Sequence, residues 1–243
     1  MITNGSRQLI TKPYQTIAIA DCGEPLVAIP AEFSRLDPHP YVAVGAPYGD
    51  RSPFFLRSGI VQRLQLAQAR LQQRQPTWRL QIFDAYRPIA VQQYMVDHSF
   101  AQECQRRGLV PEAITAAAAD SIWQAVYQFW AVPSLDLAMP PPHSTGAAVD
   151  LTLIDGAGKA VAMGSEIDQM VPQSHPQFFA ASTGLQEQDY HQRRSLLFEV
   201  MAAAGFLHHP QEWWHFSFGD QIWAWQMELQ LAQPQTAIYG YIC

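Results

Sequence analysis

The chain has 243 residues, of which 48% are hydrophobic and only 15% are charged. This composition excludes an intrinsically disordered chain and allows either one large domain or two small ones. With 15 basic against 21 acidic residues and a formal net charge of −6, the chain lacks the basic excess that nucleic-acid binding requires.

The three cysteines, Cys22, Cys104 and Cys243, lie far apart in the sequence. An odd number without a Cys-x-x-Cys pair makes no complete disulfide framework, which favours a reducing compartment. The first residues lack the basic start and apolar run of a secretory signal. The longest apolar segment, residues 113–132, is interrupted by polar side chains. We therefore expect a cytoplasmic protein with neither a membrane nor a nucleic-acid partner.

The first half of the chain predicts two helices and one strand after a long irregular segment. Residues 21–55 are rich in Pro, Gly and Asp, which favours short strands or a functional loop. Apolar residues recur at helical spacing from Leu56 to Leu71 and predict an amphipathic helix. The alternation from Trp78 to Phe83 predicts a strand. Pro88 is typical of a first helical residue and predicts a helix over Ile89–Gln105.

The second half predicts two further helices and two strands. Helices are expected over about Pro111–Trp130 and Gln186–Ala204. Strands are expected over Ala148–Leu153 and Trp213–Phe218. This order lacks the regular βαβ rhythm of a doubly wound sheet and favours an α+β fold. Because no repeat or linker divides the chain, we expect a single domain over residues 1–243.

The first candidate site lies in the segment Pro-Pro-Pro-His-Ser-Thr-Gly-Ala-Ala-Val-Asp, which contains His143 and ends at Asp150. On the predicted strand, Asp150 and Thr152 face one way while Val149 and Leu151 face the core. A carboxylate in an apolar strand is costly unless it is paired or bound to a cation. The segment therefore indicates a metal site. The alternative is that Asp150 accepts hydrogen bonds from neighbouring backbone.

The second candidate site is Gln-Glu-Trp-Trp-His-Phe, which contains Glu212 and His215. Together with His143 and Asp150, His215 would complete two nitrogen ligands and one oxygen ligand. Such a set leaves a fourth tetrahedral position for water, as in catalytic zinc sites, and Glu212 could take the proton of that water. Residues three apart point to opposite faces of a strand, so this assignment requires a turn or bulge at Glu212–Trp213. The alternative is an aromatic core cluster with a hydrogen-bonded histidine.

The third candidate site is Phe-Asp-Ala-Tyr-Arg-Pro, in which Arg87 lies between the predicted strand and the helix that follows. An arginine held there could stabilise a developing oxyanion with two donors. Either Asp84 or Tyr86 could orient it. The alternative is a surface arginine at a helix start.

Taken together, the three segments resemble the D-alanyl-D-alanine dipeptidases of the VanX type, which are zinc D,D-peptidases of the M15 family. The resemblance runs from about Pro40 to Gly219, with each motif in the expected order. The matching residues are Tyr86, Arg87, Pro88, His143, Gly146, Asp150, Glu212, Trp214 and His215. A further stretch, Met-Gly-Ser-Glu-Ile-Asp followed by Ser-His, looks like the corresponding stretch of the family.

The resemblance implies a small antiparallel sheet flanked by helices, the hedgehog/D,D-peptidase-like zinc fold, with one zinc ion per chain. It also implies a role for each matched residue: zinc ligands at His143, Asp150 and His215, the general base and acid at Glu212, the group that stabilises the tetrahedral intermediate at Arg87, and substrate-binding residues at Asp168 and Tyr86. One departure is Pro141, where the family has a serine. Any substrate contact made by that serine is lost or replaced here.

The function that the resemblance implies is zinc-dependent hydrolysis of D-Ala-D-Ala to two D-alanine molecules. One alternative is a D,D-carboxypeptidase that acts on longer peptidoglycan stem peptides, and another is a non-catalytic zinc-bearing binding domain. The absence of a secretory signal disfavours the first alternative, and the presence of Glu212 and Arg87 disfavours the second. The expected partner is therefore a small D,D-dipeptide, while a homo-oligomer is left open.

Overall fold

The computed structural model describes residues 12–242 and is built around a five-stranded sheet. The strands, in their order across the sheet, are β2 (Ser34–Arg35), β4 (Arg79–Asp84), β5 (Ala148–Ile154), β7 (His215–Ser217) and β6 (Leu207–His208). Every pairing is antiparallel except that of β2 with β4, which is parallel. The α+β class and the small antiparallel sheet predicted from the sequence are confirmed, and the one parallel pair was not predicted.

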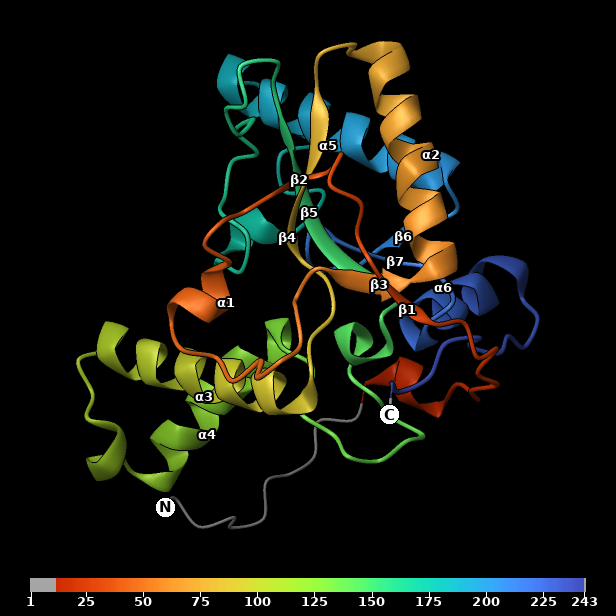
Figure 1. Ribbon diagram of the computed structural model, residues 1–243. Helices are drawn as coiled ribbons and strands as arrows, with labels where there is room; N and C mark the ends of the chain where they lie inside the picture. The colour runs from red at the N-terminus through yellow and green to blue at the C-terminus, as the bar shows by residue number, and fades with distance from the viewer. Residues whose placement is uncertain (1–11, 243) are drawn as a thin grey trace.

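Two pairs of helices flank this sheet and enclose separate apolar clusters (Figure 1). The first pair is α2 (Ser58–Arg74) and α5 (Leu185–Ala203), which pack together and against the sheet. The second pair is α3 (Ile89–Arg106) and α4 (Ala116–Phe129), which pack together in a lobe below the sheet in Figure 1. Helical spacing explains the first cluster, because Ile60, Leu64, Ala67 and Leu71 of α2 form one fully buried stripe.

The Pro-rich segment of residues 21–55 contains more regular structure than the sequence indicates. It forms β1 (Leu26–Ala28), β2 and the short helix α1 (Pro40–Ala43). Strand β1 pairs with β3 (Phe55–Arg57) in a second, two-stranded sheet. These elements are too short to show a periodic pattern, so sequence periodicity could not predict them.

Several predicted boundaries need correction. Pro88 is the N-cap of α3 and not its first residue. The helix expected from Pro111 begins at Ala116, because the Thr115 hydroxyl accepts a hydrogen bond from the Ala118 N–H and caps the helix there. The strand expected from Trp213 begins at His215.

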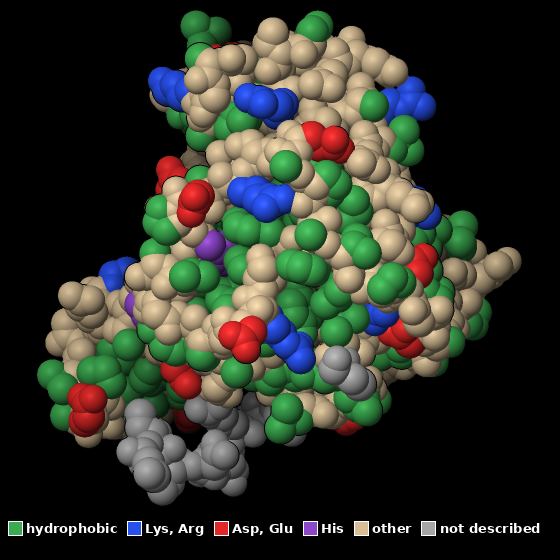
Figure 2. All heavy atoms as spheres, in the orientation of Figure 1, with side chains coloured by type: hydrophobic (Ala, Val, Ile, Leu, Met, Phe, Trp, Pro, Cys, Tyr) green, Lys and Arg blue, Asp and Glu red, His purple; other side chains and the backbone are tan. Residues whose placement is uncertain are grey.

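The C-terminal part of the fold adds α6 (Gln221–Leu231), which the sequence pattern did not predict. This helix packs against a 3-10 turn, Pro13–Thr16, at the start of the described chain. None of the described helices combines the length and apolar character needed to cross a bilayer. On the face seen in Figure 2, basic side chains lie apart from one another and among acidic ones.

Candidate active site

Three neighbouring strands of the sheet bring polar side chains into register at one level. Asp84 of β4 lies opposite Asp150 of β5, and Asp150 lies opposite His215 of β7. An irregularity in β4 between Ile82 and Asp84 shifts the register so that the first pair aligns. All seven residues of β5 are buried, so the polar face predicted for Asp150 is covered as well. The Asp150 carboxylate therefore lies in the middle of the sheet, with an aspartate on one neighbouring strand and a histidine on the other.

His143 reaches this level from the 3-10 turn Pro142–Thr145 that precedes β5. Its Nδ1 donates a hydrogen bond to the carbonyl of Ala85 at 2.8 Å, which fixes the ring and leaves Nε2 as the free acceptor. Gly146 ends the turn in the left-handed region, with φ of 69°, and allows the chain to enter β5 directly. The turn thus aims one imidazole nitrogen at Asp150.

Substitution of Gly146 should disturb this turn measurably. A side chain costs about 1–3 kcal/mol at a left-handed position, and a Cβ at Gly146 would lie 2.5 Å from Leu26 Cδ2. We expect Gly146→Ala to lower Tm by about 2–12 °C in a thermal melt. Gly158→Ala is the matched control, because Gly158 also has a positive φ but has open space where its Cβ would lie. A larger loss for Gly158→Ala would contradict the steric part of this prediction.

The ligand atoms of His143, Asp150 and His215 form a cluster and all lie within 4.8 Å of one another. His143 Nε2 lies 3.1 Å from His215 Nδ1 and 3.3 Å from Asp150 Oδ2, and His215 Nδ1 lies 3.0 Å from Asp150 Oδ1. These separations match the edge of about 3.3 Å of a tetrahedron with metal–ligand bonds of about 2.0 Å. Asp150 Oδ1 is buried without a hydrogen-bond partner, which a cation would supply. The donor set therefore fits zinc, the cofactor predicted from the sequence.

The contacts of Asp150 also decide between the two interpretations that the sequence left open, a metal site or an acceptor of hydrogen bonds from neighbouring backbone. Its carboxylate contacts the imidazoles of His143 and His215 and the guanidinium of Arg87, whereas the sequence also allowed backbone donors. Burial opposes ionisation, but the two histidines outweigh it and lower the pKa of Asp150. Asp150 is thus an anion in a buried site, as a metal ligand must be.

Glu212 lies beside this cluster because the chain turns just before β7. Trp213 and Trp214 form the turn that the sequence assignment required, and Glu212 Oε2 lies 3.9 Å from His215 Nδ1. Burial raises the pKa of Glu212 to about 8, and a bound cation would lower it. A carboxyl group that titrates near neutral pH can both accept and return a proton.

Arg87 also lies beside Asp150, and several partners hold its guanidinium in place. Its Nε and Nη2 donate to Asp84 Oδ2 at 2.9 and 2.7 Å, and its Nη1 donates to Gln92 Oε1 at 2.9 Å. The guanidinium lies 4.9 Å from the ring centres of both Tyr41 and Trp130. Of the two candidates for orienting Arg87, Asp84 is therefore the one that does so.

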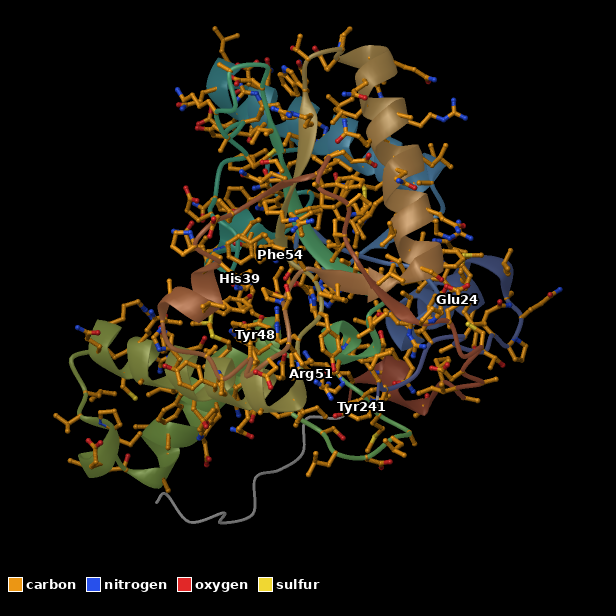
Figure 3. All side chains as sticks on the ribbon, in the orientation of Figure 1. Glu24, His39, Tyr48, Arg51, Phe54 and Tyr241 are labelled. Carbon is orange, nitrogen blue, oxygen red and sulfur yellow. The ribbon has the colours of Figure 1, made fainter. Side chains whose placement is uncertain are left out.

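Asp84 is itself fixed by two residues from the Pro-rich segment. His39 Nε2 lies 3.1 Å from Asp84 Oδ1, and the Tyr48 hydroxyl donates to the same oxygen at 3.1 Å. His39 caps α1, and Tyr48 lies in the loop that follows it (Figure 3). The segment that looked irregular in the sequence thus positions the arginine through Asp84.

Asp168 reaches the same pocket from a loop after β5, whereas Tyr86 does not line it. Asp168 Oδ2 accepts a hydrogen bond from the Tyr41 hydroxyl at 2.6 Å. Burial, together with the nearby charge of Asp150, raises the pKa of Asp168 to about 7. The Tyr86 hydroxyl instead accepts a hydrogen bond from Arg51, outside the pocket lining. Tyr41 is the tyrosine that sequence reasoning missed, because its short helix carries no recognisable motif.

The pocket is completed by residues from three further segments. His209 Nδ1 lies 3.8 Å from Glu212 Oε1, and Trp130 with its neighbours at the end of α4 forms one wall. Lys12 and Tyr14, from the start of the described chain, line the pocket as well. The sequence offered no signal for either of these last two residues.

Comparison with known proteins finds matches that span most of the chain. The model of the M15 peptidase family, described as D-ala-D-ala dipeptidase, matches residues 34–234. A D-alanyl-D-alanine dipeptidase of Synechocystis sp. is 48% identical over 239 residues, which cover 95% of this chain and 97% of the relative. That of Escherichia coli is 35% identical over 82 residues, covering 34% of this chain and 40% of the relative. The D,D-pentapeptidase VanY, solved with Zn(II), matches 92% of this chain and 97% of its own at 18% identity, with a TM-score of 0.45.

Proposed function

The chain belongs to the D-Ala-D-Ala dipeptidase family of M15 peptidases, and from this premise we propose that it hydrolyses D-Ala-D-Ala to two D-alanine molecules with one zinc ion. The observation that carries the proposal is one buried pocket in which three ligand atoms converge between a carboxyl group and a fixed guanidinium. Metallopeptidase chemistry needs these three parts together: a metal site, a proton carrier and an oxyanion donor.

In this proposal His143, Asp150 and His215 hold the zinc ion. When bound, zinc supplies a Lewis acid that polarises the scissile carbonyl and acidifies water. The hydrogen bond from His143 Nδ1 to Ala85 keeps Nε2 directed at the ligand cluster. His143 is therefore held in place through its second ring nitrogen, and Asp150 and His215 are held by the register of the sheet.

Glu212 carries the proton from the attacking water to the leaving amine. Its position beside His215 and its raised pKa suit a group that is a base in the first step and an acid in the second. Arg87 donates to the oxygen that becomes negative as the carbonyl carbon turns tetrahedral. Asp84 and Gln92 hold the guanidinium so that little reorganisation is needed during the reaction.

Asp168 binds the free ammonium group of the substrate. A buried carboxyl with its pKa near 7 gains most by pairing with a cation, and the Tyr41 hydroxyl fixes its orientation. We place the enzyme in a reducing cytoplasm, since Cys22 and Cys104 are both free thiols. The non-catalytic binding domain finds no support, because both Glu212 and Arg87 are present and aimed at the pocket.

Substrate length separates the dipeptidase from the D,D-carboxypeptidase. We expect the zinc enzyme to release D-alanine from D-Ala-D-Ala far faster than from L-Ala-L-Ala or from a stem peptide ending in D-Ala-D-Ala. In a longer peptide, the residue before the scissile bond has no free ammonium to pair with Asp168. A site built for a charged group strongly rejects an analogue that lacks this group. Comparable rates on the stem peptide would establish the carboxypeptidase instead, and zinc-loaded enzyme inactive on all three would refute hydrolysis.

A further inference from the structure

One of the two lysines of the chain lies in the active-site pocket. Lys12 is half-buried there, and its Nζ donates a hydrogen bond at 2.7 Å to the carbonyl of Tyr127, in the last turn of α4. An ammonium group has three N–H donors, and this bond uses one. Burial lowers the pKa of Lys12, so a bound anion would offset the cost of keeping the charge in the pocket.

The segment that carries Lys12 is fastened to the rest of the fold. The Lys12 backbone N–H donates to Gln15 Oε1 at 2.8 Å, and Tyr14 and Ile17 are buried. Further on, the Ile17 carbonyl accepts a hydrogen bond from Gln221 of α6 at 2.7 Å. Lys12 is thus held at the pocket by the packing of its own segment, as a specificity-determining residue must be.

The position of Lys12 relative to Glu212 identifies which part of the substrate it faces. Lys12 and Glu212 line the same pocket, and among the carboxylates there it is Glu212 whose charge acts on Lys12. Glu212 must protonate the leaving amine, and in a dipeptide that amine and the terminal carboxylate are bonded to the same Cα atom. The carboxylate therefore emerges beside Glu212. Asp168 lies with Tyr41 and Arg87, where the other end of the dipeptide would be bound.

We infer that Lys12 binds the terminal carboxylate of the dipeptide and so restricts the enzyme to substrates with a free carboxyl end. This inference rests on the proposed function. Pro142, which also lines the pocket, offers neither an N–H nor a hydroxyl group, and the proposed function assigns Arg87 to the oxygen of the scissile carbonyl. Lys12 and Asp168 together would match the two opposite charges of a free dipeptide.

The test compares D-Ala-D-Ala with D-alanyl-D-alaninamide, which lacks the negative charge, on zinc-loaded full-length enzyme. We expect Lys12→Met to lower kcat/KM for the acid by about 10- to 100-fold, mainly through KM, because a charge-assisted hydrogen bond is lost. The amide should change by less than about threefold, since it never made that bond. Lys12→Arg should restore part of the preference for the acid. Lys159→Met, at the other lysine, is the matched control and should change neither substrate.

Equal losses on the acid and the amide would overturn the inference and leave Lys12 as a cap of α4. Zinc content and Tm of each variant would show whether such a loss comes from misfolding. Wild-type enzyme that holds zinc and hydrolyses neither compound would refute the proposed function rather than the role of Lys12. In that case, binding alone tests the role of Lys12. Both compounds are titrated calorimetrically into two variants, Glu212→Gln and the double variant Glu212→Gln with Lys12→Met. A preference for the acid that Lys12→Met abolishes supports the inference, and its persistence overturns it.

Discussion

Replacing Glu212 by Gln is expected to lower kcat for D-Ala-D-Ala by at least about 10²–10⁴-fold, the range typical of general acid–base catalysis. The amide of glutamine has nearly the shape of the carboxyl group but cannot take a proton from water. Because the same group must also protonate the leaving amine, both steps are impaired and the loss can exceed this range. Steady-state kinetics with the purified, zinc-loaded variant measure the effect.

Two further measurements show whether a loss of activity comes from the missing proton carrier. Zinc content should stay near one per chain, because Glu212 lies beside the cluster but its oxygens are 3.8 and 3.9 Å from the nearest imidazole nitrogens. Glu199→Gln is the control for a lost carboxylate, since Glu199 is an exposed residue of α5 paired with Arg74. If Glu212→Gln retained activity within about threefold of wild type, the proton carrier would have to be another group.

The residues that the sequence placed in the candidate site lie close together in short segments of the chain. His143 and Asp150 lie in one short segment, and Glu212 and His215 lie in another, so each pair is fixed by a turn next to a strand. Strand geometry requires a turn or bulge at Glu212–Trp213 if Glu212 and His215 share a site, and the structure has a turn one residue later, at Trp213 and Trp214. Strand pairing then aligns Asp150 with His215, which no local pattern could have shown.

The residues that were missed are those whose role depends on contacts between distant segments. Tyr41, His39 and Tyr48 belong to a Pro-rich stretch without periodicity, and they reach Asp84 or Asp168 only after the chain has folded. The resemblance implied a substrate-binding role for Tyr86, but the structure places Tyr86 outside the pocket that Arg87 lines, in keeping with the opposite directions of neighbouring side chains in extended backbone. Of the two neighbouring residues of this motif, only Arg87 lines the pocket.

The Pro-rich segment illustrates how an irregular sequence can serve a catalytic group. Arg87 is buried, and burial opposes its charge, yet Tyr41, Asp84 and Asp150 raise its pKa. A buried guanidinium is stable only when its donors are satisfied, and here two of the partners that fix Asp84 come from residues 21–55. The segment therefore contributes to the site through charge compensation and not through a motif of its own.

Replacing His215 by Ala should abolish tight zinc binding and, with it, hydrolysis. Loss of an outer hydrogen-bond partner usually weakens metal affinity by about 10- to 100-fold, and loss of one of only three ligands should weaken it by more than 100-fold. The variant should contain little zinc after dialysis, which elemental analysis measures. Zinc at 100 times its Kd stabilises a protein by about 2.7 kcal/mol, or about 5–10 °C in Tm for a chain of this size. We expect that rise in wild-type protein and not in His215→Ala.

His209→Ala is the matched control for this prediction. His209 lines the same pocket and its ring centre lies 5.3 Å from that of His215, but it is not one of the three clustered ligands. Its removal should therefore change zinc affinity by less than about 10-fold and preserve the rise in Tm on adding zinc. Zinc retained by His215→Ala and lost by His209→Ala would move the metal to a different pair of imidazoles. Because the two side chains occupy one pocket, this comparison separates direct coordination of the metal from a general disturbance of the site.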